Sequence, residues 1–163
     1  NLGGFANVSF ALQKNRIAYD IGACNIILNH FAQHLGSAYA DRGQLAQKGL
    51  CDDSLLQKLN NIDYYSLNPP KSLAREFKET QLLPLLSSYD AKTVLHTYTK
   101  HIGLQIGMSL TTCKAKKCLV TGGGTHNHFL IDQIKQHTSC RLEIPDQTII
   151  DYKEALILSL IHI

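Results

Sequence analysis

Apolar and polar residues alternate in short blocks along the chain, and the spacing of these blocks predicts a mixture of strands and helices. Residues 5–12 and 16–20 are short, apolar-rich segments separated by the polar cluster 13–15, a pattern that predicts a β-hairpin. In residues 25–35 the apolar positions recur at helical spacing, and Gly36 follows as a residue suited to the left-handed C-terminal cap of a helix.

The middle of the chain, residues 37–87, breaks into short helical pieces and loops. An aspartate at position 52 or 53 is expected to begin one of these helices. The sequence Asn-Pro-Pro at 68–70 enforces a loop, because proline fixes its own backbone angle and disfavours the helical region for the residue before it. Lys71 and Ser72 are therefore expected on a relatively rigid turn.

The longest helical pattern covers residues 90–110 and carries one apolar stripe, which we expect to face the core. The rest of the chain predicts a strand at 117–120, a glycine turn at 122–124, a helix at 127–137, a strand at 141–144 and a helix at 154–161. A hairpin followed by β-α-β-α alternation is typical of a layered α/β domain.

Size and charge narrow the class of protein. The 163 residues are 44% hydrophobic and 18% charged, which is enough for one ordinary core in a single domain. The net charge of +3 is small and the basic residues are spread over many segments, so we expect no nucleic-acid partner. No apolar stretch approaches the roughly 18 to 20 residues of a membrane helix, so we expect no membrane association.

The cysteines and the chain ends add two expectations. Five cysteines without a CxxC pair fit reduced, mostly buried thiols in the cytoplasm better than a disulfide framework or a zinc site. The chain opens at Asn1 without a methionine and stops at Ile163 within an apolar run, from which we expect a piece of a longer protein.

The first motif that could carry chemistry is Asn1-Leu2-Gly3-Gly4. Two glycines ahead of a strand let backbone N–H groups approach an anion closely, so Asn1, Gly3 and Gly4 are candidates for phosphate binding. A plain β-turn is the simpler explanation of these four residues taken alone, because glycine is a common turn residue.

The second motif contains Asp20, at the end of a predicted strand, with Gly22 leading toward the helix that starts near Asn25. A carboxylate there can face a cleft and act as a general base, which must lie within about 3 Å of the group it deprotonates. Aspartate is also a favoured helix N-cap, and the local pattern supports both interpretations equally.

The third motif runs from the strand residue Val120 through Gly122, Gly123 and Gly124 to Asn127. Glycines remove Cβ atoms that would block a purine or ribose, and a helix N-terminus offers unpaired N–H groups. Gly122, Gly123, Gly124 and Asn127 are therefore candidates for nucleotide binding, with tight packing of the turn as the alternative. The motif matches neither the P-loop nor the dinucleotide-binding fingerprint.

The eight histidines do not form a metal-binding pattern. His126 and His128 are two residues apart, which on a helix places them on different faces, and no HExxH motif is present. We therefore expect no protein-bound metal, and any Mg²⁺ to be held mainly through nucleotide phosphates and water.

Six blocks of the sequence, in this order, resemble successive blocks of the anhydro-N-acetylmuramic acid kinase family, within the superfamily of sugar kinases, heat-shock proteins and actin. The blocks are NLGGFANVSF at 1–10, YDIGACN at 19–25, ADRGQLAQKG at 40–49, NPPKSLAREF at 68–77, VTGGGTHN at 120–127 and DYKEALILSL at 151–160. The resemblance covers nearly the whole chain. It implies that residues 1–163 form the C-terminal lobe of an actin-like kinase, an RNase H-like α/β lobe with a mixed sheet flanked by helices, and that residues 37–87 are an insertion on the substrate side.

The same resemblance implies one active site, in which water opens the 1,6-anhydro bond of anhydro-N-acetylmuramic acid while the γ-phosphoryl group of ATP passes to O6, a step of peptidoglycan recycling. Asp20 matches the proposed general base of the family, and Gly122, Gly123 and Gly124 match its adenosine motif. The positions expected on this basis to bind the sugar are Asn25, Lys71, Ser72 and Glu154. The family also implies Mg²⁺ and a homodimer of the full-length protein.

The sequence departs from the family pattern around Asp20 and after Ser72. Ile21, Ala23 and Cys24 stand where threonine, proline and glycine are usual, and Leu73 and Ala74 stand where threonine and glycine are usual. Two alternative functions remain open. The chain could belong to another actin-like sugar kinase, or it could be a nucleotide-binding or dimerising module without catalysis.

The resemblance also implies a strand ahead of Asn1. In an actin-like lobe that strand is central, so without it the sheet would expose an unpaired edge. We therefore expect the chain to need the upstream polypeptide for a stable, active enzyme.

Overall fold

The computed structural model describes residues 1–146, 148 and 150 of the chain. Its strands are β1 (Phe5–Leu12), β2 (Asn15–Ala23), β3 (Lys117–Leu119) and β4 (Arg141–Glu143). Its α-helices are α1 (Asn25–Gln33), α2 (Gln44–Gln47), α3 (Asp53–Asn60), α4 (Asp63–Ser66), α5 (Leu83–Leu86), α6 (Ala91–Thr112) and α7 (His128–Gln136). Single turns of 3₁₀-helix (Asp41–Gly43, Gly123–His126) and one of π-helix (Lys78–Leu82) complete the description.

These elements confirm most of the predicted ones. The hairpin, the short helices of the middle segment and the strand–turn–helix–strand order after α6 are all present. Gly36 has the expected left-handed backbone, with φ of 77°. Of the two aspartates, Asp52 is the N-cap of α3, because its carboxylate accepts a hydrogen bond of 2.7 Å from the Leu55 N–H. The predicted helix at 154–161 lies outside the described residues.

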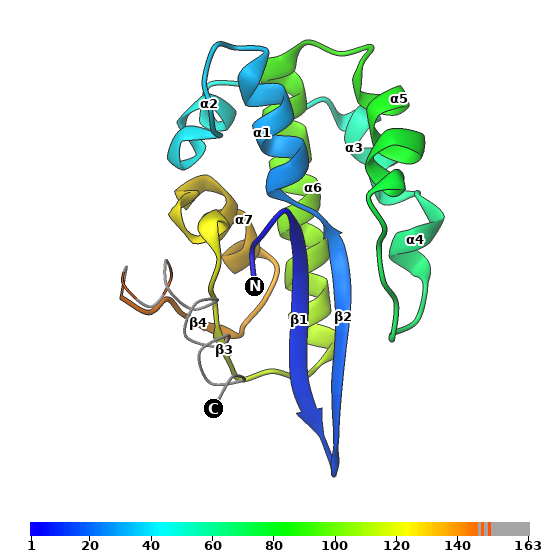
Figure 1. The fold of residues 1–163 in the computed structure, drawn as a ribbon, viewed down its shortest axis with the longest axis vertical. Coiled ribbons are helices and arrows are strands. Elements are labelled where there is room, and N and C mark those ends of the chain that lie inside the picture. The colour runs from blue at the N-terminus through cyan, green and yellow to red at the C-terminus, as the bar shows by residue number, and fades with distance from the viewer. Residues whose placement is uncertain (147, 149, 151–163) are drawn as a thin grey trace, which may run out of the picture.

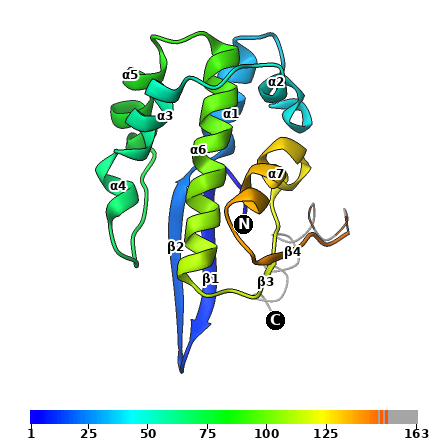
Figure 2. The ribbon, with the colours of Figure 1, turned by 180° about the vertical axis from the view of Figure 1, so that it is seen from behind.

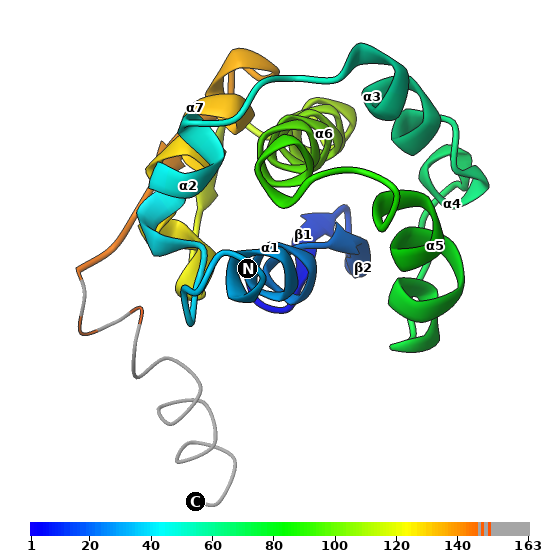
Figure 3. The same cartoon turned by 90° about the horizontal axis from the view of Figure 1, so that it is seen from above.

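Helix α6 is the axis of the fold. Figure 1 shows it running behind α1 and the β1–β2 hairpin, and Figure 2 shows it from the opposite side, in front of them. Figure 3, viewed from above, shows the other helices arranged around it. Helices α2 and α7 lie on one side of α6, and α3, α4 and α5 lie on the other (Figure 3). Asp90 caps α6 by accepting hydrogen bonds from the Lys92 and Thr93 N–H groups, both of 3.1 Å.

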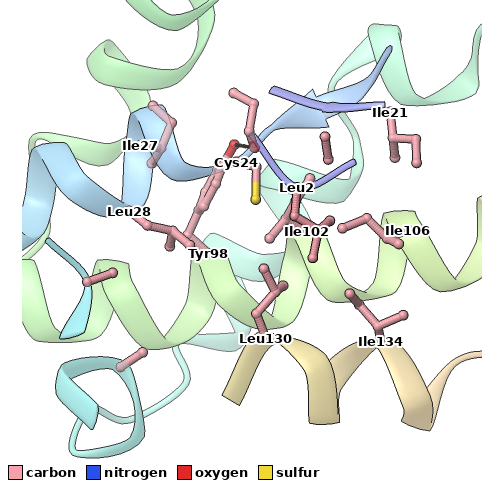
Figure 4. Packing of buried hydrophobic residues seen from close by; sticks show 14 of the residues in the cluster. Leu2, Ile21, Cys24, Ile27, Leu28, Tyr98, Ile102, Ile106, Leu130 and Ile134 are labelled. Atoms are coloured by element: carbon pink, nitrogen blue, oxygen red, sulfur yellow. Dashed lines mark hydrogen bonds between the residues drawn. The ribbon is translucent and has the colours of Figure 1, made fainter. Parts of the chain in front are cut away.

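The apolar stripe predicted on α6 is buried, as expected. Figure 4 shows Tyr98, Ile102 and Ile106 of α6 between residues of the hairpin and α1 on one side and Leu130 and Ile134 of α7 on the other. Because α6 has buried residues around much of its circumference, it holds the strands and the surrounding helices in one core.

The strands form two small sheets, where a mixed sheet was predicted. Strands β1 and β2 pair antiparallel, and β3 and β4 pair parallel. The residue Leu2 joins the two sheets: it forms an antiparallel bridge with Ala6, and its N–H donates to the Thr121 carbonyl at 2.6 Å. The α/β class is therefore confirmed, with Leu2 placed between the hairpin and the end of β3.

The β2 strand is longer than predicted and contains a bulge. It continues to Ala23, so Gly22 lies within the strand and the prediction that it forms the turn into the next helix is wrong. Asp20 pairs with Asn7, whereas Gly22 pairs with Ala6, which leaves the intervening Ile21 as an extra residue in β2. Bulges of this kind bend a strand and re-aim its side chains, and they are frequent beside active sites.

Candidate active site

The residue Leu2 brings the two glycine motifs together. Its carbonyl accepts hydrogen bonds from the Gly124 N–H at 2.8 Å and from the Asn25 side-chain amide at 3.0 Å. The Gly3 carbonyl accepts from the Asn25 N–H at 3.2 Å, and the Gly4 carbonyl accepts from the Cys24 N–H at 2.8 Å. The start of α1 and both glycine turns therefore meet at one point, although they are far apart in the sequence.

Gly3 and Gly4 form the bend between Leu2 and Ala6, so the turn interpretation describes their geometry. Packing does not explain why both are glycine. A Cβ on Gly3 would lie 3.4 Å from its nearest neighbour, the Asn1 Nδ2 atom, and a Cβ on Gly4 would lie 3.9 Å from the Ile26 Cβ, which are ordinary contacts. Within the described chain no hydrogen bond reaches the N–H group of Gly3 or Gly4, so both donors are available to an anion.

The three glycines at 122–124 have different surroundings. Gly122 has a left-handed backbone with φ of 92°, and a Cβ there would lie 2.5 Å from the Asn1 Oδ1. A Cβ on Gly124 would lie 2.7 Å from the Leu2 Cβ. Packing therefore explains Gly122 and Gly124, whereas a Cβ on Gly123 would meet nothing within 4 Å.

Gly123 opens onto a cavity of about 380 Å³. The predicted site residues Asn25 and Asn127 line the same cavity. Asn127 caps α7, because its Oδ1 accepts from the Leu130 N–H at 2.9 Å. Its Nδ2 is buried and has no hydrogen-bond partner within the described part of the chain, and an orphaned buried donor is costly unless a ligand completes it.

The cavity also contains residues that the sequence analysis did not assign. They are Asn29, Tyr39, Ala40, Arg42 and His126. The block at 40–49 indicated this region only through the resemblance to the kinase family. The turn before α2 packs against the start of α7, since a Cβ on Gly43 would clash with the Asn127 Oδ1 and would lie 2.8 Å from the Phe129 Cβ. This contact joins segments that are far apart in the sequence, so residue patterns alone do not reveal it.

The Asp20 carboxylate is half-buried at the bulge of β2. Its Oδ2 accepts a hydrogen bond of 2.9 Å from the Leu73 N–H, and no hydrogen bond to its Oδ1 is found among the described residues. The N-cap interpretation of Asp20 is wrong, because Cys24 occupies that position of α1. A carboxylate with one oxygen fixed and the other without a protein donor is suited to accept a proton.

Asp20 lies in a row with Asn1. Asn7 pairs with Asp20 across the hairpin, and on its other side the Asn7 N–H donates to the Asn1 carbonyl at 3.0 Å. Neighbouring strands are about 4.8 Å apart, so the Cα atoms of Asn1 and Asp20 are separated by roughly 10 Å.

The remaining predicted sugar-binding residues are placed differently from one another. The Lys71 ammonium donates to the Tyr64 carbonyl at 2.9 Å and lies 4.6 Å from the centre of the Tyr64 ring. Ser72, the next residue, is exposed, and Glu154 lies outside the described residues. Among the described members of this group, Asn25 lines the cavity at Gly123, and Lys71 and Ser72 do not.

Cys24, one of the departures from the family pattern, is a buried structural residue. It is fully buried, and this burial raises the pKa of its thiol to about 12, so the thiol stays neutral. All five cysteines are free thiols, but Cys24 and Cys140 are buried whereas Cys51, Cys113 and Cys118 are only partly buried, so the prediction that most of them are buried is wrong.

The described residues hold no group of three or more histidine, cysteine, aspartate or glutamate side chains that could bind a metal ion. Over the same residues, none of the helices combines the length and the hydropathy required to cross a bilayer.

The comparisons with known proteins agree on one class, the kinases. The family model described as anhydro-N-acetylmuramic acid kinase matches residues 1–161. Curated relatives with that name are 34% identical over 150 residues in Chromohalobacter salexigens, 31% over 144 residues in Hahella chejuensis and 32% over 149 residues in Bacillus cereus. The chain belongs to the anhydro-N-acetylmuramic acid kinase family.

The matches cover most of this chain but less than half of each relative. In the first two, the aligned part is 84% of this chain and 40% or 39% of the relative. The chain therefore spans about two fifths of the length of these relatives.

Proposed function

We propose that this chain is one lobe of an ATP-dependent kinase that opens the 1,6-anhydro bond of anhydro-N-acetylmuramic acid and phosphorylates O6. The observation that carries the proposal is the cavity at Gly123, which is lined by a glycine without a packing constraint and by Asn127, a residue whose buried amide has no hydrogen-bond partner within the described part of the chain. Membership of the family supports the choice of substrates, and the geometry supports the assignment of the residues.

In this proposal the adenosine occupies the cavity beside Asn127. Tyr39 and Arg42 would form part of its wall. The triphosphate extends toward the unpaired N–H groups of Gly3 and Gly4, which suit an anion because glycine lets a ligand approach the backbone closely. Mg²⁺ bound to the phosphates would neutralise their charge during transfer.

Asp20 acts as the general base. It takes a proton from the water that attacks C1 of the sugar, the bond between C1 and O6 breaks, and the freed O6 attacks the γ-phosphorus as the bond to ADP breaks. The free Oδ1 is the atom that receives the proton, while the Leu73 N–H fixes Oδ2. General base catalysis contributes typically about 10² to 10⁴ in rate.

We also propose that the fold is RNase H-like, with an additional strand from the rest of the kinase between β1 and β3. A groove lined by Val8, Ile106, Leu119 and Val120 separates these strands. Asn1 and Leu2 pair with β1 on one side and with the end of β3 on the other, which is the arrangement of a strand between them. The homodimer and the cytoplasmic location rest on the family and on the cysteine content alone.

The test is the formation of phosphorylated sugar from ATP and 1,6-anhydro-N-acetylmuramate by the full-length protein. We expect turnover by the unmodified protein and a loss of about 10² to 10⁴ in kcat for Asp20→Asn. Asp132→Asn, a surface aspartate paired with Lys135 at 3.5 Å, is the matched control and should keep the unmodified rate. Retained turnover by Asp20→Asn would remove Asp20 from the mechanism, and no turnover by the unmodified protein would favour a non-catalytic module.

A further inference from the structure

Three residues of the middle segment, Tyr64, Lys71 and Leu73, form hydrogen bonds with Asp20, and none of them was predicted to act on it. The segment at 71–73 runs beside β2 and holds Asp20 at two places. The Asp20 N–H donates to the Lys71 carbonyl at 3.0 Å, and the Leu73 N–H donates to the Asp20 Oδ2 at 2.9 Å. The backbone and the carboxylate of Asp20 are therefore both fixed by the same short segment.

Tyr64 holds Asp20 from a second direction. Its hydroxyl donates to the Asp20 carbonyl at 2.6 Å. Tyr64 is buried, and its burial, together with the nearby charge of Asp20, raises the pKa of the hydroxyl above its ordinary value. The hydroxyl therefore remains protonated and remains a donor.

The Lys71 side chain links the segment at 71–73 to Tyr64. Its ammonium donates to the carbonyls of Tyr64 at 2.9 Å and Tyr65 at 3.5 Å, and it lies 4.6 Å from the centre of the Tyr64 ring. Such cation–π contacts hold an ammonium group over an aromatic ring. Asp20, Lys71 and Tyr64 thus form a closed cycle in which each residue is bound to the other two.

The cycle lies beside the bulge of β2, where it can determine the orientation of the Asp20 carboxylate. Asp20 immediately precedes the bulged residue Ile21, where the ladder with β1 is interrupted. A residue beside an interruption has fewer ladder bonds to fix its direction, so external supports determine where its carboxylate points. The cycle supplies those supports from the side of β2 opposite β1.

We propose that Tyr64 and Lys71 are positioning residues that hold the Asp20 carboxylate in the orientation needed for proton transfer. This inference rests on the proposed function, because it requires Asp20 to be the base. It also gives Lys71 a role other than direct contact with the sugar.

The test compares Tyr64→Phe and Lys71→Met in the full-length kinase with a matched pair elsewhere in the chain. Lys58 donates to the Tyr89 hydroxyl at 3.2 Å and lies 5.8 Å from the centre of that ring, on the surface. We expect kcat to fall about tenfold in Tyr64→Phe and Lys71→Met, with KM for ATP within about twofold. Tyr89→Phe and Lys58→Met should retain the unmodified values.

A double variant distinguishes positioning from a general loss of stability. If Tyr64 acts through Asp20, adding Tyr64→Phe to Asp20→Asn should not lower the residual rate further, because the orientation of an absent base no longer matters. Calorimetric titration with ATP checks that each variant is folded, since neither Tyr64 nor Lys71 lines the cavity at Gly123.

Three results would overturn the inference: an unchanged kcat in Tyr64→Phe, a rise in the KM for the sugar alone in Lys71→Met, or a further loss of rate in the double variant. Retained turnover by Asp20→Asn would instead overturn the proposed function. An inactive Asp20→Asn beside a fully active Tyr64→Phe would leave the function intact and remove only the positioning role.

Discussion

At the scale of single residues, the glycines at 122–124 are of two kinds: packing requires two of them to be glycine, and it does not require the third. Gly122 and Gly124 are in contact with Asn1 and Leu2, whereas Gly123 faces open space in the cavity. In the sequence the three glycines form one motif, because a glycine that avoids a clash with the chain looks the same there as one that leaves room for a ligand. Only the positions of Asn1 and Leu2 distinguish these cases.

This difference predicts opposite results for two substitutions in the full-length kinase. Gly124→Ala should lower the free energy of unfolding by about 1 to 3 kcal/mol, because the new Cβ would lie 2.7 Å from the Leu2 Cβ. Gly123→Val should leave the unfolding free energy within about 1 kcal/mol and raise the KM for ATP about tenfold, because its methyl groups enter the cavity. Urea denaturation and initial rates measure the two quantities. An unchanged KM in Gly123→Val would place the nucleotide elsewhere.

At the scale of secondary-structure elements, the contact between α6 and α7 depends on two further glycines. A Cβ on Gly103 would lie 2.5 Å from the Gln133 Cβ, and a Cβ on Gly107 would lie 2.5 Å from the His137 Cβ. The two glycines are four residues apart, so they lie on the same face of α6 and let α7 approach closely. Helix α7 in turn carries Asn127 at its start, so this contact positions one wall of the cavity.

Alanine at Gly103 or Gly107 tests this contact. Alanine favours an isolated helix over glycine by about 1 kcal/mol, but the clash with α7 should cost more, so we expect a net loss of about 1 to 3 kcal/mol in unfolding free energy. Met108→Ala, at an exposed position of the same helix, should change it by no more than about 1 kcal/mol. Stabilisation by Gly103→Ala would mean that α7 is not held against α6 in this way.

The elements with strong periodicity were predictable, and the connections between them were not. The stripe on α6 and the alternation after it follow directly from residue spacing, and Asp52 and Asn127 are caps of the expected type. The bulge at Ile21 was missed, because register depends on the partner strand as well as on the strand itself. For the same reason the candidate site was predicted only in part: Asp20, Gly123 and Asn127 belong to sequence motifs, whereas the places of Tyr39, Arg42 and Tyr64 depend on packing between distant segments.

At the scale of the whole molecule, the two sheets leave facing edges with a groove between them. The Asn7 N–H points into this space, toward the Asn1 carbonyl, and alternation along the strand turns the Ser9 N–H the same way. On the other side, the Thr121 carbonyl and, by the same alternation, the Leu119 N–H point toward it. A strand that continues upstream from Asn1 would pair with both edges.

Amide hydrogen exchange of the full-length kinase tests this arrangement. We expect the Ser9 and Leu119 amides to be protected from exchange to a degree similar to amides within the core, because a strand between β1 and β3 would accept their hydrogen bonds. Exchange as fast as that of an exposed loop would contradict the RNase H-like arrangement and leave the two sheets separate.

In the proposed mechanism, the two glycine turns and the Asp20 carboxylate surround one nucleotide and one sugar. The most direct measurement is a crystal structure of the full-length kinase with a non-hydrolysable ATP analogue and 1,6-anhydro-N-acetylmuramate. We predict adenosine in the cavity at Gly123 and Asn127, phosphates near Gly3 and Gly4, and Asp20 within about 3 Å of a water that faces C1 of the sugar. A nucleotide bound outside that cavity, or an Asp20 carboxylate far from the sugar, would contradict it.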